Sequence, residues 1–204
     1  MKLKSRLFSL SINLDSLIAA ACGFIIIQIF SNHSGVGVSP DSVTYISAAR
    51  HLLQGNGFRA FDGLPVVDFP AGYPFFITIV SFITRMDVLQ FGAILNGMLF
   101  GSLIYLSGSI MNGFYHTSAW YKRFMLACIV FSPALLEVYS MLWSETLFLL
   151  LLMLFTIAMK QYLERLEMKW LIISAVLVSL ACVTRYAAIV LIGIGLFLIF
   201  FEGK

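Results

Sequence analysis

The stretch Tyr73–Thr84, YPFFITIVSFIT, decides how the rest of the chain is arranged. It is apolar, but a helix needs about 20 apolar residues to cross a bilayer, and this run is clearly shorter. If it spans, every later segment changes sides of the membrane. Its length favours an interfacial or re-entrant segment over a span.

The composition around this stretch is that of a membrane protein. Of 204 residues, 60% are hydrophobic and only 11% are charged, whereas a soluble domain has about 25% charged residues. Most of the surface is therefore expected to face lipid. The basic residues lie in short clusters between apolar runs rather than on one face, which argues against a nucleic-acid partner.

The three cysteines, Cys22, Cys128 and Cys182, lie inside apolar runs without paired spacing. This pattern predicts small buried hydrophobic residues rather than a disulfide framework or a metal site.

Six apolar runs are candidate membrane spans: Leu14–Phe30, Val88–Ile110, Phe124–Tyr139, Thr146–Met159, Leu171–Val183 and Tyr186–Phe201. The first resembles a signal peptide up to the AAAC that ends at Cys22, but its apolar run continues beyond that point, which indicates a retained helix. The predicted fold is therefore all-α: a polytopic transmembrane helical bundle of about six spans, forming a single domain over residues 1–204.

The distribution of positive charge predicts the orientation. Cytoplasmic loops carry an excess of Lys and Arg. If Tyr73–Thr84 does not span and the N-terminus is cytoplasmic, only four basic residues are outside: Arg50, Arg59, Arg85 and Arg185. If it spans, six others, including Lys122 and Lys169, move outside. The first arrangement predicts a multi-pass cell-membrane protein with a cytoplasmic N-terminus and a large extracytoplasmic loop over residues 31–86.

The polar stretch Val38–Phe58 within that loop predicts an amphipathic surface helix. Ser39 suits an N-cap and Pro40 the first helical position. Asp41 then lies in the first turn, where the helix dipole favours a negative charge. Gly55 is expected to end the helix. The expected apolar stripe consists of Ile46, Ala49 and Leu53.

Two shorter patterns concern packing. Pro70 and Pro74 predict a rigid turn that starts the short apolar helix. Gly97 and Gly101 form a GxxxG pattern, which predicts close packing against a neighbouring helix of this chain or of another copy.

Four stretches then carry a resemblance: PDSVTYISAARHLLQGNGF, FPAGYPFF, SPALLEVYSMLWSETLFLLLL (Ser132–Leu152) and LACVTRYAAIVL (Leu180–Leu191). Their order and spacing resemble the N-terminal half of bacterial dolichyl-phosphate-mannose–protein mannosyltransferase-like proteins, which are GT-C glycosyltransferases. The resemblance implies a polyprenyl-phosphate-linked sugar as donor. It also implies an essential aspartate in the first loop, matched here by Asp41, a second acidic position, matched by Glu145, and a basic residue near the lipid phosphate, matched by Arg185.

Two departures from the family pattern limit what the resemblance implies. Protein mannosyltransferases carry an Asp-Glu pair in the first loop, whereas Asp41 is followed by Ser42. The resemblance therefore does not specify a protein as the acceptor, and the expected acceptor is a lipid, a glycan or a protein. Family members are about twice as long, so a missing C-terminal half or a second chain is an expected partner, together with membrane lipids.

Simpler explanations exist for the three site residues. Asp41 and Glu145 are also typical first-turn residues, with Ser144 as the expected cap of the second helix, and Arg185 is also placed to extend to the membrane interface. In the catalytic interpretation, Asp41 is the base of an inverting transfer, Arg185 holds the phosphate, and Glu145 positions the donor head group, a water or a metal. A divalent metal such as Mg or Mn is allowed but not required, because no ligand cluster is evident.

A non-enzymatic alternative stays open: a membrane scaffold or half of a transporter. Transporters commonly show internal repeats and broken helices near mid-membrane. The sequence contains no evident repeat, and its acidic residues cluster at the predicted outer face, which favours a surface reaction.

Overall fold

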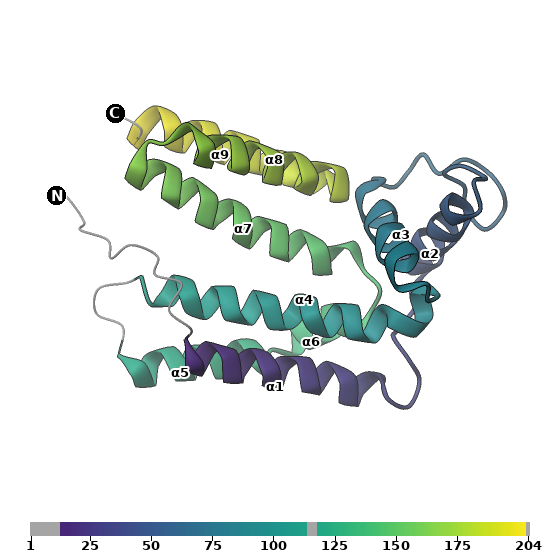
Figure 1. Ribbon diagram of the computed structural model, residues 1–204, viewed down its shortest axis with the longest axis horizontal. Helices are drawn as coiled ribbons and strands as arrows, with labels where there is room; N and C mark the ends of the chain where they lie inside the picture. The colour runs from purple at the N-terminus through teal and green to yellow at the C-terminus, as the bar shows by residue number, and fades with distance from the viewer. Residues whose placement is uncertain (1–12, 114–117, 203–204) are drawn as a thin grey trace. The chain divides into compact units, whose positions relative to one another are not determined.

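The computed structural model describes residues 13–113 and 118–202 (Figure 1). Within these ranges every regular element is helical and no strand is present, which confirms the all-α class. The chain forms two compact units, each made from two separated stretches. The first unit contains residues up to 37 and residues 92–141, and the second contains residues 38–91 and those from 142 onward.

The first unit is built from α1 (Leu14–Ser31), most of α4 (Val88–Met111), α5 (Ala119–Val130) and α6 (Pro133–Ser140). Helices α1 and α4 approach closely at glycines. A Cβ on Gly101 would lie 3.1 Å from the backbone oxygen of Ala20, and one on Gly97 would lie 2.6 Å from Nε2 of Gln28. The GxxxG pattern therefore packs against a helix of the same chain.

A break divides the run that the sequence predicts as one span, Phe124–Tyr139. The chain bends by 48° between α5 and α6. Ser132 caps α6 with its side chain and Pro133 occupies the first helical position, so a new helix starts there instead of the old one continuing.

The second unit contains α2 (Pro40–Leu53), α3 (Gly72–Thr84), α7 (Ser144–Arg165), α8 (Met168–Thr184), η1 (Tyr186–Ala188) and α9 (Ile189–Glu202). Helices α7, α8 and α9 run alongside one another (Figure 1). Leu166 adopts a left-handed conformation at the end of α7, with φ of 55°, and the chain reverses into α8. This hairpin brings the start of α7 beside the end of α8.

Three of the described helices are long and apolar enough to cross a membrane, namely α1, α4 and α7, and a fourth crossing results if α5 and α6 together form one bent span. This supports a membrane protein. Helices α8 and α9 are shorter, as is α3, so the predicted number of six spans stays a prediction.

Helix α2 begins as its sequence predicts. The Ser39 side chain accepts a hydrogen bond from the Ser42 amide, and Ser42 Oγ accepts one from the Ser39 amide, which completes a capping box. The helix ends before Gly55, whose φ is 75°.

The predicted apolar stripe of α2 is only partly right. Ile46 and Ala49 are buried, but Leu53 is 42% exposed. Tyr45 and Ala48 complete the buried face instead, because α3 packs against α2 and places the Tyr73 ring against that of Tyr45. The prediction that the cysteines are buried is also wrong. Cys22 and Cys128 are exposed and Cys182 is half-buried, and all three are free thiols.

Candidate functional site

The start of α7 supplies the acidic residue that the sequence singles out. Trp143, in an extended conformation, is the N-cap residue, and its side chain makes no capping bond. Ser144 is the first helical residue, so the expectation that Ser144 caps α7 is wrong. Its hydroxyl is therefore available to other groups, and it lies 3.4 Å from Oε2 of Glu145.

Arg185 lies where α8 ends and η1 begins, with extended backbone angles. Its guanidinium forms an ion pair with the Glu145 carboxylate, and Nη1 also lies 3.5 Å from Ser144 Oγ. About a third of each charged side chain remains exposed. The α7–α8 hairpin thus places the basic residue at the end of one helix against the acidic residue at the start of the other.

Helix α2 contributes two contacts to the same cluster. The Tyr45 hydroxyl donates to Ser144 Oγ at 3.5 Å, and the Trp143 indole Nε1 donates to Ser39 Oγ at 2.7 Å. Burial raises the pKa of the Tyr45 hydroxyl, and the negative charges of Asp41 and Glu145 raise it further. Tyr45 therefore keeps its proton and acts as a hydrogen-bond donor at neutral pH.

Asp41 stands apart from the ion pair. It is exposed in the first turn of α2, and no hydrogen bond or ion pair to another described residue holds its carboxylate. It lies one helical turn before Tyr45, and residues four apart share a helix face. The structure therefore brings Glu145 and Arg185 into contact and leaves Asp41 accessible close to the same cluster.

Helix α3 and the residues just before it hold Tyr45 in place through aromatic contacts. The Tyr73 ring is fully buried and meets the Tyr45 ring edge to face, with centroids 5.2 Å apart. Phe69, which precedes α3, also meets the Tyr45 ring edge to face, with centroids 5.4 Å apart. Edge-to-face pairs of this kind favour a fixed ring orientation, so Tyr45 is held where its hydroxyl meets Ser144.

Metal-binding side chains do not cluster among the described residues. Among residues 13–113 and 118–202, no three His, Cys, Asp or Glu side chains lie close enough together to hold an ion. The one carboxylate inside the cluster, Glu145, is already paired with Arg185. The divalent metal that the sequence allows therefore stays a prediction, and no step below uses one.

The sequence singled out Asp41, Glu145 and Arg185 but missed the residues that connect them: Tyr45, Trp143 and Ser144. Tyr45 could have been found from its spacing to Asp41, since the two lie on one helix face. Ser144 is adjacent to Glu145 but was assigned to capping. No pattern in the sequence indicates that Trp143 reaches Ser39.

The chain matches no protein-family model, and no curated protein or solved structure is significantly similar to it.

Proposed function

We propose that this protein is an integral membrane glycosyltransferase that moves a sugar from a polyprenyl phosphate to a lipid, glycan or protein acceptor at the outer membrane face. The observation that carries the proposal is the paired Arg185 and Glu145 beside the Tyr45 and Ser144 hydroxyls, with Asp41 one turn away on α2. Such a transfer needs a base for the acceptor hydroxyl and positive charge beside the leaving phosphate, and an accessible carboxylate and an arginine are suited to these roles.

The proposal includes the membrane arrangement expected from the positive charges. Six spans, a cytoplasmic N-terminus and an extracytoplasmic loop over residues 31–86 would put α2, α3 and the start of α7 on the outer side. Polyprenyl-phosphate sugars present their phosphate at a membrane surface, so the cluster would meet the donor there.

In the proposed reaction, Asp41 takes the proton from the acceptor hydroxyl as that oxygen attacks the anomeric carbon. The bond between the anomeric carbon and the phosphate oxygen breaks, and its electron pair leaves with the polyprenyl phosphate. The configuration at the anomeric carbon is thereby inverted. Asp41 acts as general base, a role that typically contributes about 10²–10⁴-fold. The proton then passes from Asp41 to water.

Arg185 would neutralise the charge that develops on the leaving phosphate. A guanidinium has five N–H donors, so it can hold a carboxylate and a phosphate together. Glu145 therefore orients Arg185 toward the donor, and Tyr45 and Ser144 supply neutral donors nearby. Electrostatic stabilisation of this preorganised kind is usually a large part of catalysis.

The test is transfer from a labelled polyprenyl-phosphate sugar, with native membranes as the acceptor source and the purified full chain as enzyme. Asp41→Asn should fold and bind donor, because asparagine also suits a helix start, yet transfer should fall about 10²–10⁴-fold. Glu145→Gln should cost less, since it only orients its partner. Arg185→Gln should weaken donor binding itself.

The matched control is Asp62→Asn. Asp62 is also an exposed aspartate of the second unit, but its carboxylate accepts from the Leu64 amide in a local turn, and asparagine can replace it there. Its transfer rate should equal the wild-type rate. An Asp41→Asn protein that folds, binds donor and transfers at the wild-type rate would eliminate Asp41 as the base.

A further inference from the structure

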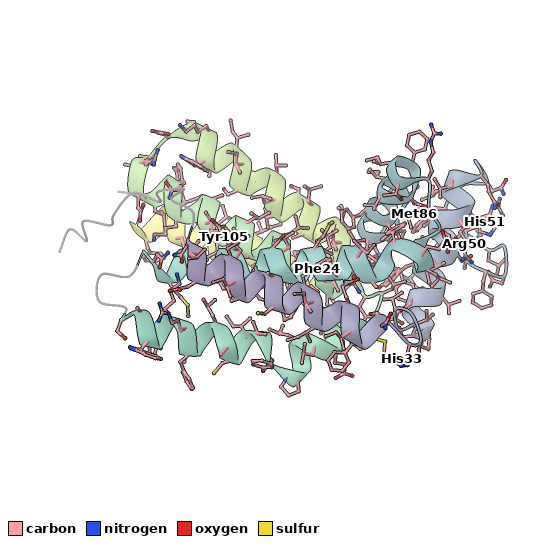
Figure 2. All side chains as sticks on the ribbon, turned by 60° about the horizontal axis from the view of Figure 1, so that its bottom comes forward. Phe24, His33, Arg50, His51, Met86 and Tyr105 are labelled. Carbon is pink, nitrogen blue, oxygen red and sulfur yellow. The ribbon has the colours of Figure 1, made fainter. Side chains whose placement is uncertain are left out.

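A groove of about 630 Å³ lies on the second unit, away from the cluster around Glu145, where α2 and α3 end and the chain turns into α4. Helix α2 contributes Leu53, the last turns of α3 contribute Ser81, Phe82 and Ile83, and the connection contributes Arg85, Met86 and Asp87. Met86 is labelled in Figure 2, together with Arg50 of α2. The lining thus combines large apolar side chains with one arginine and one aspartate.

The apolar part of this groove continues along one face of α3. On the other face, Tyr73, Ile77 and Ser81 are buried. The exposed face carries large apolar side chains at helical spacing, with exposed fractions between 47% and 74%: Phe75, Ile79, Phe82 and Ile83. The Phe58 ring stacks on that of Phe75, with centroids 6.2 Å apart, and Ile79, Phe82 and Ile83 are each more than half exposed.

The length of α3 limits what can cover it. Thirteen residues extend over about 20 Å at 1.5 Å per residue, which is less than the hydrocarbon thickness of about 30 Å. The described part of the chain contains three helices that are long and apolar enough to cross a bilayer, so α3 belongs to a protein that is expected to lie next to lipid. A short helix with one apolar face suits the interfacial layer of such a surface.

The charged part of the groove indicates what kind of lipid group would bind. Arg85 ends α3 in a left-handed conformation, with φ of 56°, and is exposed. Among the described residues it has no ion-pair partner. The neighbouring acid, Asp87, is held by Arg50 through two bonds of 2.9 Å each. An arginine that lacks a carboxylate partner and lies next to apolar side chains is suited to the phosphate of a phospholipid.

We propose that this groove binds a membrane phospholipid, with Arg85 on its phosphate and Phe82 and Ile83 against its acyl chains, and that α3 thereby lies in the interfacial layer of the membrane. This holds whether or not the protein transfers sugars, because it uses none of the groups assigned to that reaction. It also assigns one of the two arrangements, interfacial or re-entrant, that the sequence leaves open for this segment.

The position of α3 is tested with nitroxide labels on the full chain in phosphatidylglycerol-containing nanodiscs, after Cys22, Cys128 and Cys182 are replaced by alanine. Labels at positions 75, 79, 82 and 83 should collide with oxygen more than with a water-soluble nickel complex, and at similar depths. A label at position 62 should show the reverse. Three results would overturn the proposal. The first is access of the nickel complex along α3, and the second is low access of both reagents, as expected if a second copy of the protein covers the helix. The third is a membrane depth that increases steadily from position 75 to position 83, as expected for a re-entrant segment.

The role of Arg85 is tested by native mass spectrometry of the purified protein with added phosphatidylglycerol or diacylglycerol. The wild type should bind the phosphate-bearing lipid in preference. Arg85→Gln should weaken the tightest binding event about tenfold, the effect of losing one charge-assisted hydrogen bond, and Arg85→Lys should restore most of it. The control, Arg165→Gln, removes an exposed arginine at the end of α7 and should leave binding unchanged.

Two outcomes would show that Arg85 does not bind a phospholipid phosphate. One is equal retention of both lipids by the wild type. The other is an Arg85→Gln protein, with unchanged helix content, that binds phosphatidylglycerol as tightly as the wild type.

Discussion

At Gly72 the chain has no room for a side chain. A Cβ added there would lie 2.6 Å from the backbone oxygen of Val183 and 2.9 Å from the amide nitrogen of Thr184. Because both neighbours are backbone atoms, they cannot move aside by a rotamer change. The first residue of α3 is therefore in direct contact with the last turn of α8, the turn that precedes Arg185.

We expect Gly72→Ala to destabilise the protein by about 1–3 kcal/mol, the usual cost of overpacking, as measured by thermal unfolding in detergent. Gly193→Ala in α9 is the control, since a Cβ there meets no atom within 4 Å and alanine is the better helix former. Equal stability of the two variants would contradict the close contact between α3 and α8.

At the scale of elements, α2 is connected to α7 through its cap. Ser39 closes the capping box with Ser42, and its hydroxyl also accepts from the Trp143 indole. One side chain therefore serves both the start of α2 and the residue that precedes α7. Since Asp41 and Tyr45 belong to α2, and Ser144 and Glu145 to α7, this contact helps to hold the candidate site together.

Hydrogen exchange in detergent can test this connection. The amides between Ile46 and Leu53 should exchange slowly in the wild type. Ser39→Ala should accelerate exchange in α2 about fivefold, which corresponds to the loss of about 1 kcal/mol from an N-cap. Amide exchange at the start of α7 should also become faster, because Trp143 loses its bond to Ser39.

Ser118→Ala is the matched control for that experiment, because Ser118 caps α5 in the first unit with the same kind of bond. It should leave exchange in α2 unchanged. If the wild-type amides of α2 exchange as fast as those of an unstructured peptide, the site is not preorganised.

At the scale of the whole molecule, the open question is which residues face which side of the membrane. The positive charges predict Lys122 on the cytoplasmic side and Asp62 outside. Lys122 is only 5% exposed, whereas its neighbour Tyr121 is 57% exposed, so the tyrosine is the better position for a label.

Single cysteines at positions 62 and 121, in a protein without its native cysteines, should therefore differ in intact cells. An impermeant thiol reagent should label position 62 from outside and should reach position 121 only after the cells are opened. Labelling of position 121 in intact cells would refute the arrangement in which Tyr73–Thr84 does not span.

The features that the sequence determined by itself are those set by neighbours along the chain. Composition predicts the all-α class, Ser39 and Pro40 predict where α2 begins, and Pro70 and Pro74 predict the start of α3. The class follows from the overall content of apolar residues, and the two helix starts depend on contacts within a few residues. Ser132 and Pro133 form the same kind of pattern, and they mark the break between α5 and α6 inside the run predicted as one span.

Only the tertiary structure decided which polar groups meet. Arg185 and Glu145 are 40 residues apart, Tyr45 and Ser144 are 99 apart, and Ser39 and Trp143 are 104 apart. Their contacts depend on the α7–α8 hairpin and on the packing of α2 against α3, which arise from burial of apolar surface rather than from the polar residues. Tyr45 illustrates the difference: its sequence predicts a helix, but only the packed helices place its hydroxyl against Ser144.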